Sequence, residues 1–256
     1  MIEVRNLEKK FGEVCAVDGV SFIAKAGAIT GLLGPNGAGK TTCIRMIGTL
    51  ISIDGGHVAI DGVDVATDPN AARQACGLLT DSRGLYTRMT ARENIRYYAS
   101  LRGIDAAQSE RTLARFVEWL DMKGILDRRT DGFSQGERMK VAIAHALIHE
   151  PSNVILDEPT NGLDVMSTRA LRELVKRLKA EGRPVLFSSH VMQEVAALCD
   201  EIVIISRGRV TAQGTRDELL AQSGKNNLED AFVALSETHE IYASGSESES
   251  LREVVS

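Results

Sequence analysis

Residues Gly34–Thr41 have the sequence GPNGAGKT and fit the pattern G-x-x-x-x-G-K-[ST]. The apolar stretch Ala28–Leu33 before them indicates a strand, and Thr41–Leu50 after them repeats apolar residues at helical spacing. A glycine-rich loop between a strand and a helix is typical of the phosphate-binding P-loop. This stretch therefore predicts a nucleotide site on an α/β core.

The residue types of the loop suit phosphate binding. Glycines let backbone N–H groups point at phosphate oxygens, and the N-terminus of the following helix adds partial positive charge. We expect Lys40 to reach the β and γ phosphates of ATP and the hydroxyl of Thr41 to bind Mg²⁺. The predicted nucleotide-binding residues of this run are Gly34, Asn36, Gly37, Ala38, Gly39, Lys40, Thr41 and Thr42.

A second apolar strand, Asn153–Asp157, ends in two carboxylates, Asp157 and Glu158. Asp157 is placed to hold the hydration shell of Mg²⁺, and Glu158 to polarise the attacking water as a general base. On its own, an Asp-Glu pair after a strand is more often a solvated turn. The P-loop upstream favours the catalytic interpretation.

The bulk composition excludes several classes of function. The 256-residue chain has a formal net charge of −5, which argues against a nucleic-acid partner. The N-terminus lacks a signal-peptide pattern, and no apolar run approaches the roughly 20 residues of a membrane-spanning helix. The four cysteines show neither paired nor metal-binding spacing, as is typical of free thiols in a reducing compartment. We expect a cytoplasmic chain whose membrane role comes through a partner.

Strand and helix patterns divide the chain into regions. Strands are expected at Ile2–Leu7 and Val20–Lys25, and helical patterns dominate from Thr90 to Asp131. From Ser134 onward helices and strands alternate, which predicts a parallel sheet. We therefore predict one domain over residues 1–222, with a helical subdomain inserted at about 88–135. Residues 223–256 are predicted to form a C-terminal helix and a disordered acidic tail.

The run FSQGE at Phe133–Glu137 begins an amphipathic helix. Ser134 and Glu137 alone would form a capping box. The chain then continues with LDEPT at Leu156–Thr160, GLD at Gly162–Asp164, and His190. This ordered set resembles the ATP-binding subunits of ABC transporters, and the resemblance covers Ile2 to about Leu235. The runs Phe187–Val195 and Asn227–Phe232 look like the ABC-2-type exporters, a branch that includes the sodium-efflux ATPase subunits.

The resemblance implies a fold and an assembly. The fold is a P-loop NTPase core with a mainly parallel sheet, an N-terminal antiparallel β subdomain and an inserted α-helical subdomain. The assembly is a head-to-tail dimer, with a second copy or a related cassette, in which ATP lies between one P-loop and the partner's Ser134–Gly136. An integral-membrane permease is the implied partner, so that the chain is peripheral on the inner face of the cell membrane and touches the membrane through the permease only.

The resemblance also assigns roles to residues, with ATP and Mg²⁺ as cofactors. Glu158, His190 and Lys40 form the implied catalytic set, and Thr41, Asp157 and Asp81 the implied metal set. His190 would hydrogen-bond the γ-phosphate. The nucleotide would also contact Phe11 through adenine stacking, with Ser134, Gly136 and Asp164 at the dimer seam. A core position is the alternative for Phe11.

Two departures from the family pattern affect the expected activity. Gln135 and Glu137 stand where family signatures usually carry a second glycine and a glutamine. Asp81 stands where a glutamine normally touches Mg²⁺ and the attacking water. A carboxylate can engage the ion through water, but it cannot donate a hydrogen bond. The hydrolysis rate and the coupling assigned to that loop are therefore open.

The leading hypothesis is an ATPase subunit that powers an exporter by ATP-driven closure and opening of its dimer. One alternative is a soluble ABC ATPase that acts on ribosomes or DNA, although such proteins usually carry two cassettes or a long coiled-coil insert. Another is a nucleotide-gated module in which the Asp81 loop has lost hydrolysis. The transported substrate is chosen by the permease and does not follow from this sequence.

Overall fold

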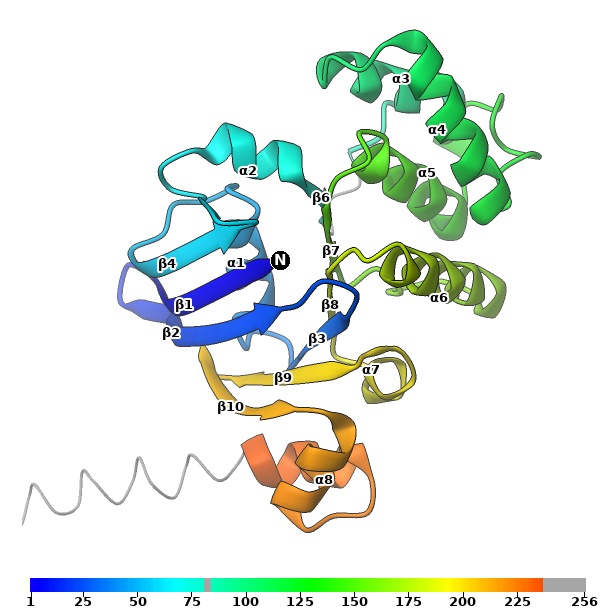
Figure 1. Ribbon diagram of the computed structural model, residues 1–256. Coiled ribbons are helices and arrows are strands. Elements are labelled where there is room, and N and C mark those ends of the chain that lie inside the picture. Colours follow the sequence, from blue (N-terminus) through cyan, green and yellow to red (C-terminus); the bar gives the residue numbers. More distant parts are fainter. Residues whose placement is uncertain (81–83, 237–256) are drawn as a thin grey trace, which may run out of the picture.

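The computed structural model describes residues 1–80 and 84–236, and Figure 1 shows two sheets with helices beside them. The strands are β1 (Ile2–Phe11), β2 (Val14–Ala24), β3 (Ile29–Leu33), β4 (Gly55–Ile60), β5 (Val63–Asp64), β6 (Cys76–Leu79), β7 (Asn153–Asp157), β8 (Val185–Ser189), β9 (Glu201–Ser206) and β10 (Arg209–Gly214). The helices are α1 (Lys40–Ile47), α2 (Pro69–Ala75), α3 (Ala91–Leu101), α4 (Ala106–Trp119), α5 (Gln135–Leu147), α6 (Val165–Ala180), α7 (Met192–Leu198) and α8 (Arg216–Ser223), with a short 3-10 turn at Thr130–Gly132. Residues 228–236 are also helical. In the described part of the chain, no helix has the length and apolar character to span a membrane.

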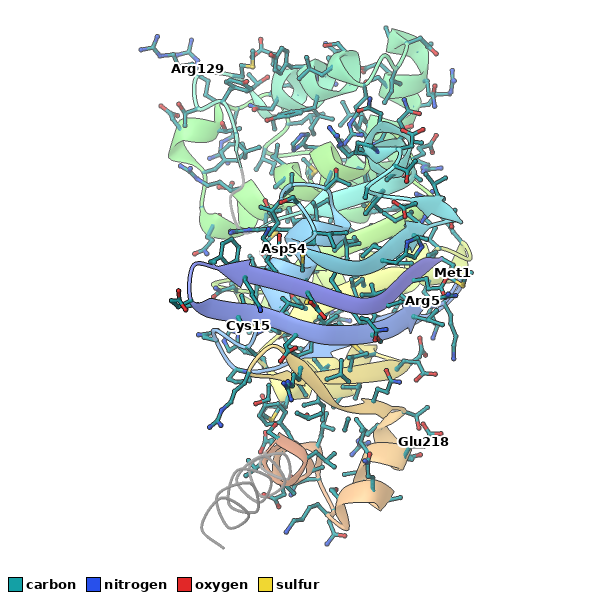
Figure 2. The ribbon with its side chains drawn as sticks, turned by 90° about the vertical axis from the view of Figure 1, so that its left-hand side faces the viewer. Met1, Arg5, Cys15, Asp54, Arg129 and Glu218 are labelled. Atoms are coloured by element: carbon teal, nitrogen blue, oxygen red, sulfur yellow. The ribbon has the colours of Figure 1, made fainter. Side chains whose placement is uncertain are left out.

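The N-terminal sheet is antiparallel, in the order β2-β1-β4-β5. Ile2, Val4 and Leu7 of β1 are buried and share one hydrophobic cluster with Ile44 and Ile47 of α1. Figure 2 shows β1 and β2 side by side across one face of the molecule. The predicted antiparallel β subdomain is confirmed, and it packs against the helix that follows the P-loop.

The larger sheet has the order β10-β9-β3-β8-β7-β6. Its strands from β9 to β6 pair in parallel, and only β10 runs antiparallel to its neighbour. Every residue of β3, β7 and β8 is buried, as expected of strands covered on both faces. Because the carboxyl ends of parallel strands meet at one edge, the residues that follow β3, β7 and β8 come together there.

A group of helices, α3, α4 and α5, lies to one side of the core (Figure 1). Thr90, Asp105 and Ser134 cap the N-termini of these three helices, and Thr90 and Ser134 do so in complete capping boxes. Their apolar faces meet in a cluster that includes Ile95 and Phe116. α3 and α4 lie within the predicted helical insertion at about 88–135, whereas α5 begins at its end, in the part predicted to alternate helices and strands. The predicted α/β fold with an inserted helical subdomain is confirmed.

Several elements differ from the sequence expectation. β1 and β2 are longer than the predicted strands Ile2–Leu7 and Val20–Lys25, because they continue to a turn around Gly12. The helix α2 and the edge strand β10 were not predicted. The predicted acidic tail at Ser244–Ser250 lies outside the described residues.

Candidate nucleotide site

The P-loop follows β3 and ends at the first turn of α1. Gly37 and Gly39 adopt φ values of 82° and 106°, which side chains disfavour. A Cβ at Gly34 would lie 2.3 Å from the carbonyl oxygen of Ile205, and one at Gly39 would lie 2.6 Å from that of Ala16. The loop therefore needs glycine both for its backbone angles and for its close approach to β9 and β2.

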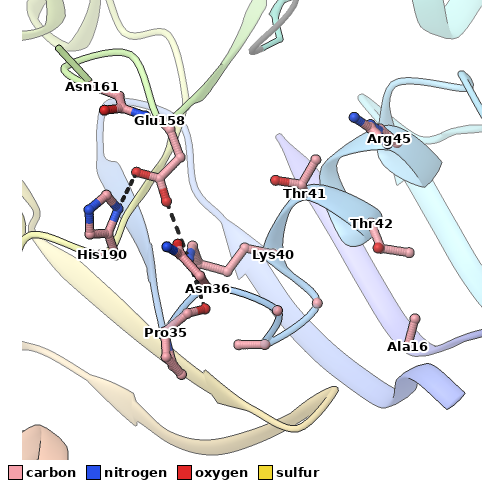
Figure 3. Close-up of a pocket in the computed structure, with 13 residues that line it drawn as sticks. Ala16, Pro35, Asn36, Lys40, Thr41, Thr42, Arg45, Glu158, Asn161 and His190 are labelled. Atoms are coloured by element: carbon pink, nitrogen blue, oxygen red, sulfur yellow. Dashed lines mark hydrogen bonds and ion pairs between the residues drawn. The ribbon is translucent and has the colours of Figure 1, made fainter. Parts of the chain in front are cut away.

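The loop lines a hollow of about 300 Å³ with residues from three other segments. Figure 3 shows Glu158 and His190 on one side of it and the P-loop on the other. The lining residues are Ala16, Pro35, Asn36, Gly37, Ala38, Gly39, Lys40, Thr41, Thr42, Arg45, Glu158, Asn161 and His190. The P-loop residues predicted to bind the nucleotide, except Gly34, are all in this lining.

Lys40 is a buried cation in this hollow, with 5% of its side chain exposed. Its Nζ donates to the carbonyl oxygens of Gly34 at 2.7 Å and Pro35 at 3.2 Å, and it lies 3.3 Å from Oε1 of Glu158. The ammonium group is thus held at the mouth of the P-loop. A fixed positive charge at this place suits the terminal phosphates of a nucleotide.

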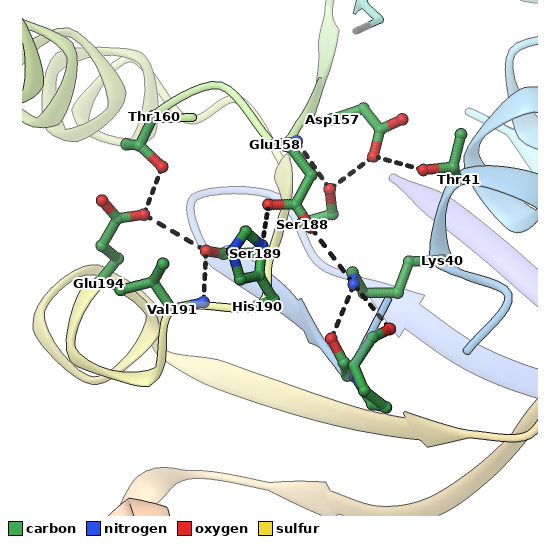
Figure 4. A network of polar contacts seen from close by, with 12 residues as sticks. Lys40, Thr41, Asp157, Glu158, Thr160, Ser188, Ser189, His190, Val191 and Glu194 are labelled. Atoms are coloured by element: carbon green, nitrogen blue, oxygen red, sulfur yellow. Dashed lines mark hydrogen bonds and ion pairs between the residues drawn. The ribbon is translucent and has the colours of Figure 1, made fainter. Parts of the chain in front are cut away.

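Asp157 and Thr41 meet at the base of the site (Figure 4). Oδ1 of Asp157 accepts hydrogen bonds from the hydroxyls of Ser188 at 2.7 Å and Thr41 at 3.3 Å. Oδ2 of Asp157 is buried and has no hydrogen-bond partner, and burial raises the pKa of this carboxyl despite the two hydroxyls. A buried carboxylate oxygen without a partner fits a cation, so these two residues suit Mg²⁺.

A Mg²⁺ site needs few protein ligands. Within residues 1–80 and 84–236, no cluster of three or more histidine, cysteine or acidic side chains could hold a metal ion. Mg²⁺ usually keeps several waters and takes one or two carboxylates together with phosphate oxygens. Asp157 and Thr41 are enough for that mode of binding.

Glu158 connects the two sides of the hollow. Its Oε2 lies 2.8 Å from Nδ1 of His190, and its Oε1 lies 3.3 Å from Nζ of Lys40. The backbone at Glu158 has a φ of 46°, in the left-handed region, and its N–H donates to Oγ of Ser188 at 2.9 Å. A non-glycine residue held at this angle is under strain of the kind that gathers at functional sites. The three residues of the implied catalytic set thus lie in contact with one another.

Ser134, Gly136 and Asp164 lie elsewhere in the fold. Ser134 and Asp164 line a different hollow, between α5 and α6. A Cβ at Gly136 would lie 2.5 Å from Oγ of Ser167, whose hydroxyl also donates to Asp164 at 2.9 Å. Ser134, Gly136 and Asp164 are not part of the P-loop hollow of the same chain.

The geometry agrees with comparisons to known proteins. The family model described as ABC transporter matches residues 17–161. The chain belongs to the ABC transporter family. This cassette is 40% identical to the ABC transporter ATP-binding protein NatA of Bacillus subtilis, over 90% of the cassette and 94% of that protein.

Two further likenesses extend this finding. The cassette is 34% identical to the Nod factor export ATP-binding protein I of Burkholderia orbicola, over 86% of the cassette and 72% of that protein. A solved structure of an ATP-binding subunit of an ABC transporter matches with a TM-score of 0.85 and 32% identity, over 92% of the cassette and 99% of that chain. The predicted family is confirmed, the relative named for export agrees with the predicted branch, and the cassette is an ABC-type ATPase that binds a nucleotide.

Phe11 and Asp81 complete the predicted site residues of the cassette. Phe11 ends β1 and is 51% exposed, with Nζ of Lys9 5.5 Å from its ring centroid. The alternative of a core phenylalanine is therefore wrong, and its ring is free to face a ligand. Asp81 lies outside the described residues. The roles assigned to all of these residues stay predictions.

The cassette also has site residues that the sequence did not reveal. Arg45 and Asn161 line the hollow, and Ser188 joins Asp157 to the backbone of Glu158. Arg45 lies four residues after Thr41, so helical spacing could have suggested that both face the same side of α1. Ser188 could have been suspected because it precedes His190 at the end of a buried strand.

Proposed function

We propose that the cassette binds Mg·ATP on its P-loop and hydrolyses it with Glu158 as the general base. The observation that carries this proposal is the position of the Glu158 carboxylate between Lys40 and His190, next to the unpartnered oxygen of Asp157. Bound Mg²⁺ would supply charge stabilisation at the phosphates. The carboxylate of Glu158 contacts Nζ of Lys40 and Nδ1 of His190, and in this position it can orient a water.

The other side chains have distinct tasks under this proposal. Lys40 holds the β and γ phosphates, while Thr41 and Asp157 hold the metal ion. His190 contacts the γ-phosphate and fixes the carboxylate that it already meets at 2.8 Å. The exposed ring of Phe11 stacks on adenine. Electrostatic positioning of this kind supplies most of the catalysis in phosphoryl transfer.

We propose that two cassettes face each other head to tail to complete the site. Ser134 and Asp164 open on a hollow that does not include the P-loop of their own chain. Ser134 also caps a helix N-terminus, where partial positive charge suits a phosphate of the neighbouring site. Closure would bring this hydroxyl to the partner's nucleotide, and hydrolysis would release it. The partner is a second copy or a related cassette.

We propose an integral-membrane permease of the ABC-2 exporter type as the driven partner, with the cassette on the cytoplasmic face of the membrane. The cassette has a groove between its core and its helical insertion, lined by Ile47, Leu50, Leu78, Thr80 and Arg102 among others. An apolar groove that also contains Arg73 and Arg102 fits a short amphipathic segment of such a permease. We assign nucleotide binding and permease contact to one domain of residues 1–222, which includes the helical insertion at about 88–135. Residues 223–256 form a C-terminal extension of this domain.

Measuring ATP turnover by the purified cassette tests the assignment of Glu158. Glu158→Gln keeps the size of the side chain but removes the base, so it should abolish turnover while ATP still binds. Wild-type turnover by that variant would refute the assigned base. Asp81→Gln, measured alongside, restores the usual donor at that position and reports what the carboxylate does to the rate.

A lack of turnover in all versions, together with ATP binding, would mean that hydrolysis requires the permease. The same variants would then be compared in membranes that contain it. If neither the wild-type cassette nor Glu158→Gln turned over ATP in those membranes, the cassette would be a nucleotide-gated module.

A further inference from the structure

Glu194 is a buried acidic side chain outside the hollow that binds the nucleotide. It lies on α7, four residues after His190, and it is 8% exposed. Burying a carboxylate is unfavourable unless hydrogen bonds compensate it. Its partners therefore indicate what the residue does.

A single oxygen of Glu194 joins two loops of the active site. Oε2 accepts a hydrogen bond from the hydroxyl of Thr160 and another from Oγ of Ser189 at 3.3 Å. Oγ of Ser189 in turn accepts the backbone N–H of Val191 at 3.0 Å. Thr160 and Ser189 are themselves buried. Figure 4 shows Glu194 beside Thr160 and Ser189, with His190 and Glu158 on the other side of Ser189.

These contacts lie directly next to the catalytic pair. Thr160 is two residues beyond Glu158 on the loop that leaves β7, and Ser189 immediately precedes His190 where β8 ends. The strained backbone of Glu158, with φ of 46°, needs such outside support to persist. The 2.8 Å contact between Glu158 and His190 depends on the spacing of these two loops.

We propose that Glu194 is a positioning residue for ATP hydrolysis. Its carboxylate ties the loop of Glu158 to the loop of His190 from behind and fixes the distance between the two side chains. It does not itself meet the nucleotide, since it is absent from the lining of the P-loop hollow. The inference uses the ATPase activity of the family and the geometry of the two loops, and it does not depend on the permease or the dimer.

Glu194→Leu and Glu194→Gln separate this role from simple packing. Leucine removes the acceptor shared by the two hydroxyls, and the resulting freedom of the loops should lower kcat about tenfold, because small misplacements of reacting groups are costly. The KM for ATP should change less than twofold, because the P-loop is untouched. Glutamine keeps an acceptor oxygen for both hydroxyls, and its kcat should stay within about threefold of wild type.

Asp200→Leu is the matched control for lost stability. Asp200 also ties separate segments, through the backbone N–H of Ile29 at 2.9 Å and Nζ of Lys179 at 2.5 Å, but at the amino end of β3. This variant should lower the thermal midpoint and keep the wild-type kcat. A kcat loss in Glu194→Leu that Asp200→Leu does not share supports positioning.

Three outcomes would overturn the proposal: a wild-type kcat in Glu194→Leu, equal kcat losses in the leucine and glutamine variants, or a higher KM with kcat unchanged. If Glu194→Leu does not fold, Thr160→Val takes its place, because it removes one of the two hydroxyls at nearly constant volume. That variant should lower kcat about threefold, and a wild-type rate there would equally refute the role of Glu194.

Discussion

Ser188→Ala tests the hydrogen bonds beneath the proposed metal site, because it removes a hydroxyl that bonds both Asp157 and the backbone of Glu158. Oγ of Ser188 donates to Asp157 at 2.7 Å and accepts from the backbone N–H of Glu158 at 2.9 Å, and the serine is fully buried. A hydrogen bond to a charged group contributes about 1.5–3 kcal/mol, and a neutral one about 1 kcal/mol. The free energy of unfolding should therefore fall by about 3 kcal/mol near pH 8, which corresponds to a lower thermal midpoint by roughly 6–12 °C.

The loss in free energy of unfolding should depend on pH, and the ionisation of Asp157 decides whether it grows or shrinks as pH falls. Burial raises the pKa of Asp157 in the folded state, and the Ser188 hydroxyl counteracts that rise by stabilising the carboxylate. In the variant this pKa rises further. The folded variant is therefore penalised most above the folded pKa, where Asp157 is ionised, and the deficit shrinks as pH falls through that pKa.

Urea unfolding of both proteins in a pH series from 8 downward measures the effect. Ser152→Ala is the control, because its hydroxyl also donates to a carboxylate, Asp61 at 2.6 Å, but at an exposed position. We expect that control to change the free energy of unfolding by less than about 1 kcal/mol. A Ser188→Ala loss no larger than the control, or one that does not shrink as the pH is lowered through the acid range, would refute the reasoning.

Two further predictions concern the adenine contact and the buried histidines. Phe11→Ala should weaken ATP binding about fivefold to tenfold, because a half-exposed ring gives about 1 kcal/mol on stacking. A nucleotide titration measures this, with Phe11→Tyr as the control that keeps an aromatic ring. Equal affinities for the wild type and both variants would contradict the stacking role. His145 and His149 have pKa values lowered to about 4, chiefly by burial and then by Arg102, so they stay neutral when folded. Since their unfolded pKa is near 6.5, stability should be retained above that value and lost as pH falls toward 4, by about 2 kcal/mol for each histidine at pH 5. Thermal unfolding between pH 7.5 and 5 measures this loss of stability. His145→Phe should make the thermal midpoint fall less steeply with pH. An equally steep fall in that variant would show that His145 does not contribute to the pH dependence.

The parts of the site that could be predicted follow from one rule of sheet geometry. Lys40 and His190 come after buried strands and Asp157 ends another, and parallel strands bring their carboxyl ends to one edge. The motifs identified the strands, and the rule placed their ends together. The contact between Glu158 and His190 was not itself predicted, but it is consistent with this arrangement.

The parts that could not be predicted depend on contacts between distant segments. Ser188 and Glu194 lie in the run Phe187–Val195 that carries the family resemblance, but the run assigned them no role, and their partners Asp157 and Thr160 are about thirty residues away. The helix α2 has the expected signals, with Asp68 as its cap and Pro69 in its first turn, but its seven residues are too few to show a helical period. Short elements and inner polar contacts are fixed by tertiary packing, which a linear pattern does not record.

The left-handed backbone at Glu158 has a consequence for the evolution and engineering of the cassette. At φ of 46°, glycine or asparagine would fit better than glutamate, by an amount on the order of 1 kcal/mol. A selection for thermal stability alone would therefore favour losing the acidic side chain that we propose as the general base. If that proposal holds, stability gained at this one position should be read as a warning of lost turnover, and stabilising changes are better sought far from the end of β7.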